Sequence, residues 1–318
     1  MQQKHLLQPD YKHQFSGHET FPLRYGWLKK AYDTVCYEGN CASTKLFSNN
    51  ESVSHFGIGK NMVSSLRHWA TVSGILHNTE KSQIETTQLG RLIFDESGFD
   101  PYMEYPTTLW LIHWMLAGRT EKTTWHWAFS YFNSTTFDRD QLTTAIEKFS
   151  DDRGWRRAAN TTIRRDVECF VKTYVPASRS KKASLEERLE SPLIELGLIK
   201  PTASSAHFQM IRGPKSTLSM GIFLFALIEF WGSKSSASTL SYEAIAHEPG
   251  SPGRVFLLDD SSLSQILTNL DTFTQGAFKW SETAGLRQVV RSTELSSDLA
   301  LEFLTLDYQT RTPDKEKK

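Results

Sequence analysis

Groups able to do acid–base or metal chemistry crowd into one short segment near the amino terminus. The sequence reads Phe-Ser-Gly-His-Glu-Thr-Phe-Pro-Leu-Arg over residues 15–24. An imidazole beside a carboxylate could move a proton or bind Mg²⁺ or Mn²⁺, and a guanidinium group could hold a phosphate. We therefore predict His18, Glu19 and Arg24 as catalytic residues, with His18 and Glu19 as metal ligands. The alternative is a capping turn, in which Glu19 or Thr20 satisfies the first amides of the helix that follows.

A second polar set lies on a helix predicted over residues 60–76. Apolar residues recur there at helical spacing, two glycines precede the helix, and Gly74 can end it. The opposite side carries amide, hydroxyl and cationic groups, as the second helix of a helix-turn-helix does. The predicted DNA-binding residues on this helix are Lys60, Asn61, Ser64, Arg67 and His68. An ordinary surface helix with a solvated polar face is the alternative.

The flanking residues predict the elements that would hold this helix. A short helix is expected within residues 46–56, ending in the glycine turn. After the polar turn at 77–81, the alternating residues 84–88 and the segment 89–94 are expected to form a two-stranded wing. Residues 43–94 therefore predict one winged helix. Because such folds also bind proteins, DNA is inferred from the side chains and not from the architecture.

A basic region follows in the middle of the chain, where helices are predicted over residues 142–149 and 161–174. Between Asp151 and Lys182 there are nine basic and four acidic residues, whereas the whole chain carries no net charge. This excess favours a surface that tracks phosphates, although a solvated and partly ion-paired face is equally compatible with it. The predicted DNA-binding residues here are Arg156, Arg157, Arg164 and Arg165. The carboxylates of Asp166 and Glu168 beside them could form a metal–phosphate site, but residues of this kind are more often ion-paired on a helix face.

Composition sets broad limits on the kind of protein. The chain has 318 residues, of which 39% are hydrophobic and 12% aromatic, enough for two or three folded domains. Zero net charge argues against a highly basic, sequence-blind DNA coat protein. The three cysteines have neither zinc-site spacing nor the pattern of a secreted disulfide scaffold. With no signal peptide, and an apolar run at 218–231 too short to span a bilayer, we expect a cytoplasmic protein without membrane contact.

The predicted fold is mainly α with short β-wings, built from tandem winged-helix or helix-turn-helix-like units around helical cores. Three domains are expected: 1–97, an N-terminal winged-helix DNA-binding domain; 98–184, a helical domain with the basic helix; and 185–318, a helical and winged-helix-like domain. Buried helices are predicted at 109–117 and 124–132, with His113 and His126 as core histidines. In the last domain, helices are expected at 240–246 and 261–270 and strands at 277–280 and 286–290. No nucleotide or organic cofactor is expected, because the sequence contains no complete phosphate-binding loop.

Several segments together resemble one bacterial family. They are Phe15–Phe21, Gly57–Val63 with Leu66–Trp69, Leu89–Phe94, Arg164–Phe170 and Pro192–Ile199. The family is a domain of unknown function encoded beside phosphosulfate-reductase-like proteins in bacterial defence islands. Its best-described members are the SspB-like proteins of single-stranded DNA phosphorothioation systems. The resemblance is good over residues 14–200 and loose beyond.

The resemblance implies a DNA nickase of a phage-defence system of the restriction–modification type. It would open one strand so that partner proteins can place sulfur on the backbone. The implied partners are a cysteine desulfurase, an ATPase and an ATP-pyrophosphatase-like protein. The leading hypothesis is thus a metal-assisted endonuclease that nicks double-stranded DNA, with a homodimer left open. The alternatives are a non-catalytic winged-helix DNA-recognition or regulatory subunit, and an assembly scaffold.

Overall fold

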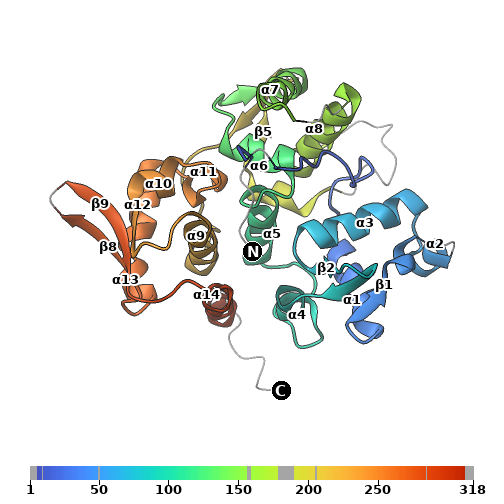
Figure 1. Cartoon of the computed structure of the whole chain (residues 1–318), viewed down its shortest axis with the longest axis horizontal. Helices are drawn as coiled ribbons and strands as arrows, with labels where there is room; N and C mark the ends of the chain where they lie inside the picture. Colours follow the sequence, from blue (N-terminus) through green and yellow to red (C-terminus); the bar gives the residue numbers. More distant parts are fainter. Residues whose placement is uncertain are drawn as a thin grey trace.

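Helices dominate the structure, and three small antiparallel sheets lie among them (Figure 1). The computed structural model describes residues 6–8, 10–48, 51–155, 159–177, 190–204, 206–283 and 285–311. Each sheet has three strands, and in each the last strand in sequence pairs with both of the others. The predicted class, mainly α with short β elements, is therefore confirmed.

The first sheet belongs to the N-terminal part of the chain. Its elements are α1 (Trp27–Tyr37), β1 (Cys41–Ser43), a 3-10 helix (Thr44–Phe47), α2 (Glu51–Phe56), α3 (Lys60–Val72), β2 (Leu76–Asn78), β3 (Gln83–Thr86) and α4 (Gln88–Phe94). A hairpin does follow the polar helix, but β2 and β3 form it, so only residues 84–86 of the expected strands lie in it. The segment 88–94, expected to belong to the wing, is instead helix α4, because the Thr87 hydroxyl accepts from the Gly90 amide and caps a new helix.

Helix α3 ends at the glycine that the sequence suggested. Gly74 has a φ of 72°, its amide donates to the Thr71 carbonyl, and the Ile75 amide donates to the Ala70 carbonyl. These two hydrogen bonds form a Schellman motif, which requires a left-handed residue at this position. The inward face of α3 buries Val63, Leu66 and Trp69.

The middle part of the chain is built around helix α5 (Pro106–Ala117), in which every residue from Thr107 to Ala117 is buried. The other elements of this part are α6 (Thr123–Ser130), β4 (Thr136–Phe137), α7 (Arg139–Asp152), α8 (Asn160–Tyr174), a 3-10 helix (Pro192–Leu196), β5 (Ile199–Pro201) and β6 (Phe208–Met210). Both core histidines lie where they were predicted. The His113 Nε2 donates to the Val255 carbonyl and its Nδ1 lies 2.8 Å from the Tyr174 hydroxyl, while His126 Nδ1 lies 2.9 Å from the Ala117 carbonyl. Burial lowers the pKa of His113 to about 4, so it is neutral and structural.

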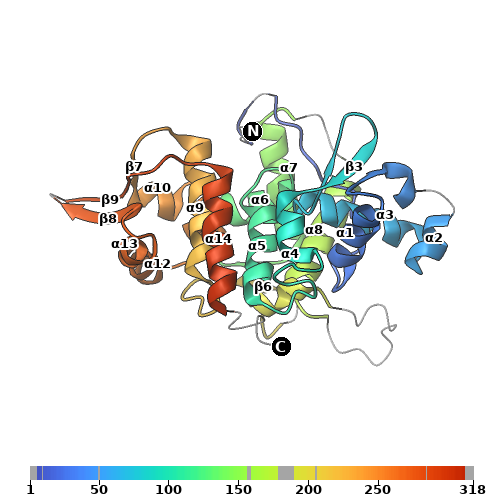
Figure 2. The same cartoon turned by 90° about the horizontal axis from the view of Figure 1, so that it is seen from below.

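The C-terminal part repeats the order of helix, strand, helices and hairpin. Its elements are α9 (Met220–Lys234), β7 (Thr239–Ser241), α10 (Tyr242–His247), α11 (Pro252–Val255), α12 (Asp260–Thr268), α13 (Leu270–Phe273), β8 (Phe278–Thr283), β9 (Leu286–Arg291) and α14 (Ser297–Arg311). The predicted helices and both predicted strands are confirmed here. Figure 2 shows α14 running beside α9. Gly221 allows this close approach, because a Cβ there would overlap Asp307 and the Phe303 carbonyl.

The three parts are joined through one continuous core. In Figure 1, α5 and α6 lie between the N-terminal part on the right and the C-terminal part on the left. The cluster of buried side chains runs through all three. The middle sheet pairs β4 with β6, which lie on either side of the domain boundary expected after residue 184. Within the described ranges, no helix combines the length and the apolarity needed to cross a bilayer.

Candidate nucleic-acid interface

A tight turn fixes the chemistry-rich segment near the amino terminus. Glu19 and Thr20 both have left-handed backbone, with φ of 47° and 67°, and the Phe21 amide donates to the His18 carbonyl at 2.8 Å. Left-handed residues at both central positions are rare outside glycine and cost free energy. The turn aims the Thr20 amide at His18 Nδ1, which accepts it at 2.9 Å. This nitrogen therefore carries no proton.

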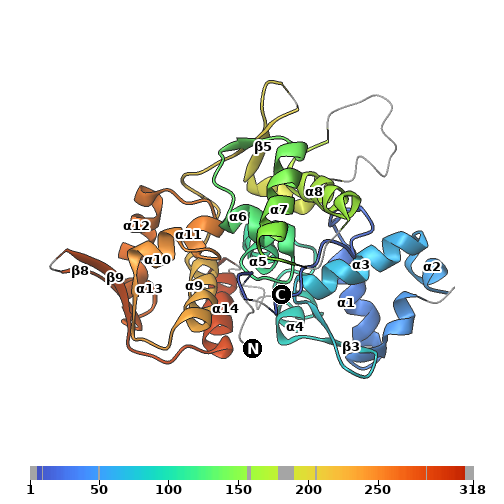
Figure 3. The ribbon, with the colours of Figure 1, turned by 45° about the horizontal axis from the view of Figure 1, so that its top comes forward.

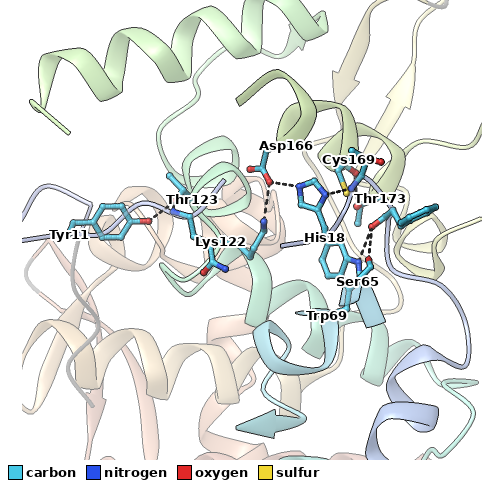
Figure 4. A network of polar contacts seen from close by, with 12 residues as sticks. Tyr11, His18, Ser65, Trp69, Lys122, Thr123, Asp166, Cys169 and Thr173 are labelled. Carbon is cyan, nitrogen blue, oxygen red and sulfur yellow. Dashed lines mark hydrogen bonds and ion pairs between the residues drawn. The ribbon is translucent and has the colours of Figure 1, made fainter. Parts of the chain in front are cut away.

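His18 lies in the interior, at the end of a buried charge network (Figure 4). Its Nε2 donates to Asp166 Oδ1 at 2.7 Å, and the ammonium of Lys122 donates to the same oxygen at 3.1 Å. Their side chains are 3%, 0% and 1% exposed for His18, Asp166 and Lys122 respectively. Burial alone would raise the pKa of Asp166, but the Lys122 charge and the His18 hydrogen bond outweigh it and lower that pKa. Asp166 is therefore an anion paired with Lys122.

The network joins three distant segments. His18 comes from the N-terminal turn, Lys122 immediately precedes α6, and Asp166 lies on α8. The Lys122 ammonium also lies 4.7 Å from the ring centroid of Trp125, which adds a cation–π contact. Before the turn, the Tyr11 hydroxyl lies 2.8 Å from the hydroxyl of Thr123, the first residue of α6 (Figure 4).

The same segment is fastened to the inner side of α3. The Phe21 carbonyl accepts from the Trp69 indole at 3.0 Å and from the Ser65 hydroxyl at 3.5 Å. Gly17, with a φ of 105°, lies so close to His68 that a Cβ there would overlap the imidazole ring. Residues 15–24 thus act as a clasp between α3 and α8, a term we keep for this segment below.

The predicted catalytic trio divides between surface and interior. Glu19 is exposed at the tip of the turn. Arg24 is 7% exposed, with its guanidinium 5.5 Å from the Phe21 ring and 5.4 Å from the Trp27 ring. The capping alternative is wrong, because α1 starts at Trp27 behind Gly26 with no side-chain cap. The catalytic roles stay predictions. Both nitrogens of His18 are already engaged in hydrogen bonds within the fold.

The outer side of α3 carries most of the predicted DNA contacts. Lys60, Asn61 and Ser64 are exposed at the amino-terminal half of the helix. Arg67 is half-buried and donates to Asn78 Oδ1 of β2 at 2.8 Å, which ties the helix to its hairpin. His68 differs from the expectation: it is half-buried against the clasp, and burial lowers its pKa well below the usual range. Being neutral, it adds no charge to this surface.

The outer side of α8 is basic but partly neutralised. Arg164 and Arg165 are exposed, and Arg164 forms an ion pair with Asp140 at 2.6 Å. Glu168 pairs with Lys172 at 2.8 Å, so the ion-paired alternative holds for this carboxylate. Arg156 and Arg157 lie outside the described residues. The three cysteines, Cys36, Cys41 and Cys169, are free thiols in half-buried or buried positions.

Sequence reasoning missed the partner of His18. The hydrogen bond between His18 and Asp166 spans 148 positions, and Lys122 has no motif around it that predicts burial. The only available signal was an aspartate in an otherwise apolar stripe of the basic helix. Long-range pairs of this kind follow from the fold and not from local spacing.

The chain is thus a mainly α protein built from three parts, each with helices and a small sheet. Its first part presents an exposed polar helix, α3, beside the clasp. Residues 15–308 match the family described as "Protein of unknown function (DUF4007)", and the chain belongs to that family. No match was found among the curated proteins. The fold is also similar to two solved structures. The SspB crystal structure is 28% identical with a TM-score of 0.83, covering 96% of this chain and 91% of that one. The magnesium ion-bound SspB crystal structure is 27% identical with the same TM-score, covering 96% and 90%. The resemblance to an SspB-like family noted from the sequence is thereby confirmed.

Proposed function

We propose that this chain is a DNA-binding protein of a bacterial DNA phosphorothioation and defence system, and that α3 contacts double-stranded DNA. The observation that carries the proposal is the exposed set Lys60, Asn61 and Ser64 at the start of α3. It is supported by the likeness to SspB along nearly the whole chain.

The geometry of the first part suits a winged helix. Strand β1 pairs with β3, and β3 with β2, around three helices of which α3 is the last before the hairpin. In winged-helix and helix-turn-helix proteins, this helix lies in the major groove with its amino-terminal residues on the base edges. An amide can read a base, a lysine can hold a phosphate, and the helix dipole favours anions at the same end.

We propose three functional units with one boundary moved. Residues 27–94 form the DNA-binding unit, close to the domain expected over 1–97. The middle unit extends to Met210 instead of ending at 184, because β4 is completed by β5 and β6. The C-terminal unit begins with α9, and its hairpin gives it a winged-helix-like outline.

DNA binding is tested by fluorescence anisotropy with a labelled duplex at low salt. The variant Lys60→Ala/Asn61→Ala should weaken binding, and the loss of one phosphate contact should reduce the salt dependence, log K against log salt, by about 0.9. The matched control is Lys29→Ala, since Lys29 is a lysine of the same unit already paired with Asp33 at 2.6 Å. Equal binding by both variants would count against α3 as the contact.

A second candidate function is metal-assisted nicking of one DNA strand, favoured by the likeness to a magnesium ion-bound SspB. Mg²⁺ prefers oxygen ligands. His18 offers no free nitrogen, and the charge of Asp166 is neutralised by Lys122. Of the carboxylates at the clasp and its buried network, only that of Glu19 is exposed. In the part of the chain that the structure describes, no three His, Cys, Asp or Glu side chains converge. His18 and Glu19 therefore do not fit Mg²⁺ as a pair.

Nicking is tested by incubating supercoiled plasmid with the protein and Mg²⁺ or Mn²⁺. Conversion to open circles supports the activity, and intact plasmid under both metals favours the non-catalytic recognition subunit. The variant Glu19→Gln tests whether the turn takes part in nicking, because it removes the exposed carboxylate without changing the buried network of His18, Asp166 and Lys122. Nicking should be lost if Glu19 is catalytic and unchanged if the turn is only structural. Partner binding to the desulfurase, ATPase or pyrophosphatase-like protein, and dimer formation, are tested by co-purification and by light scattering.

A further inference from the structure

A group of cations lies where the middle part meets the C-terminal part, away from α3. Arg212 and Lys215 lie in the loop between β6 and α9, and Arg254 lies on α11. This loop is tied to the end of α11, because the Gly213 amide donates to the Leu257 carbonyl at 2.9 Å. Figure 3 shows α11 beside α6, with α3 on the other side of the middle part.

Neutral oxygens hold these cations in place. Arg212 donates to the Leu258 carbonyl at 2.7 Å, and Lys215 donates to the Ile211 carbonyl at 2.8 Å and the Gly213 carbonyl at 3.2 Å. Arg254 donates to the Phe132 carbonyl at 3.3 Å and to Asn133 Oδ1 at 3.0 Å. Its Nε is shielded from solvent with no hydrogen-bond partner among the described residues. The charges are therefore oriented but not cancelled.

The two nearby carboxylates, Asp259 and Asp260, act on Arg212 through their charge, but their hydrogen bonds go to other groups. Asp259 Oδ1 accepts from the Ser262 amide at 2.9 Å and caps α12. Asp260 Oδ1 accepts from the Tyr242 hydroxyl at 3.0 Å. Among the described residues, no ion pair joins either aspartate to Arg212 or Lys215. By contrast, Lys234 and Lys279 in the C-terminal part pair with Glu248 and Asp271.

Mutual repulsion is visible in the ionisation of the group. Burial and the Arg212 charge lower the pKa of Lys215 to about 8; Asp259 opposes them, and Lys200 adds a smaller lowering effect. Burial and the Arg212 charge likewise lower the pKa of Arg254. Cations that repel one another and form no direct ion pair with the nearby aspartates favour the binding of an anion.

The group also extends toward α7. Both Arg153 and Arg254 act on the Tyr131 hydroxyl, where their charges oppose the rise in pKa caused by burial. The cations thus continue from the loop at 211–215 through α11 to the end of α7. They come from three separate elements: the loop before α9, α11 and the carboxyl-terminal end of α7. A chain of phosphates can contact cations on several elements at once, which a single small anion cannot do.

We propose that Arg212, Lys215 and Arg254 bind backbone phosphates of DNA, as a second contact separate from α3. This inference rests on the proposed DNA-binding function. It assigns the C-terminal part a role in holding the duplex without reading its sequence, since phosphate contacts position a protein but carry no base information.

The test compares salt dependence of duplex binding for the wild type and for Arg212→Gln/Arg254→Gln. Two lost phosphate contacts should lower the slope of log K against log salt by about 2, equally for unrelated duplex sequences. The charge-matched control is Lys234→Gln/Lys279→Gln, whose lysines are already paired. It should leave the slope within about 0.5 of the wild type. Circular dichroism establishes that each variant is folded. If the double arginine variant does not fold, Lys215→Gln takes its place, and it should lower the slope by about 1.

The outcomes separate the two proposals. If the wild type binds DNA, Lys60→Ala/Asn61→Ala weakens it and the arginine variant keeps the wild-type slope, then the second contact is overturned while DNA binding stands. If the wild type binds no DNA at low salt, both are overturned. If inorganic phosphate raises the melting temperature of the wild type but not of the arginine variant, with the DNA slope unchanged, the site holds a small anion and the DNA assignment is overturned.

Discussion

Replacing Asp166 by asparagine should cost the protein a large share of its stability. The change leaves the Lys122 ammonium without a counter-charge at 1% exposure, while the amide oxygen of the new side chain can still accept the hydrogen bond from His18. Removing one partner of a buried ion pair typically costs about 3–5 kcal/mol, because the remaining charge stays desolvated. The total stability of a domain is only about 5–15 kcal/mol, so unfolding in urea should show the loss directly.

The double variant Lys122→Met/Asp166→Asn isolates the cause. Removing both charges should recover about 2 kcal/mol relative to Asp166→Asn alone, because a neutral pair needs no counter-charge. The control Glu168→Gln breaks an exposed pair on the same helix and should cost less than about 0.5 kcal/mol. If Asp166→Asn costs less than about 1 kcal/mol, or the double variant is no better than the single one, the network does not hold the clasp as described.

Three further results are expected. First, because the folded pKa of Asp166 lies below its unfolded value, its stabilisation is complete above about pH 4 and is lost as the pH falls through the folded pKa; an acid titration in which Asp166→Asn and wild type lose stability in parallel would refute this. Second, Gly17→Ala should destabilise by about 2 kcal/mol in thermal unfolding, since it adds a clash with His68 to a left-handed φ, and an unchanged melting temperature would contradict it. Third, DNA affinity should fall about tenfold between pH 7 and pH 9 as Lys215 loses its proton; Lys215→Arg should remove that dependence, and a pH-independent wild type would count against a phosphate contact at Lys215.

Local patterns predicted the elements well wherever the chain obeys local rules. The polar helix, its glycine stop at Gly74 and the hairpin at 278–291 follow from periodicity and turn chemistry, which depend on neighbouring residues alone. Strand β1 was missed because three residues carry too little periodicity to register. The segment 88–94 was misassigned as a strand because the capping role of Thr87, which begins the helix at Gln88, was overlooked.

The site could be predicted only in part, for a physical reason. Sequence identified His18 and Asp166 as chemically rich, but could not show that they bond to each other and bury Lys122. Distant residues meet through packing, and packing decides whether a histidine is a ligand at the surface or a tie in the core. The cations at Arg212 and Arg254 were missed for the same reason, since 42 positions separate two residues whose charges act on each other in the fold.

Hydrogen–deuterium exchange of the full chain with and without a saturating duplex tests the central claim most directly. The account predicts that backbone amides near Lys60, Asn61 and Ser64 exchange more slowly with DNA bound, while the exposed turn after α1 at Glu38 and Gly39 is unchanged. Protection that leaves the start of α3 untouched while DNA is demonstrably bound would contradict the assignment of α3 as the DNA-contacting helix.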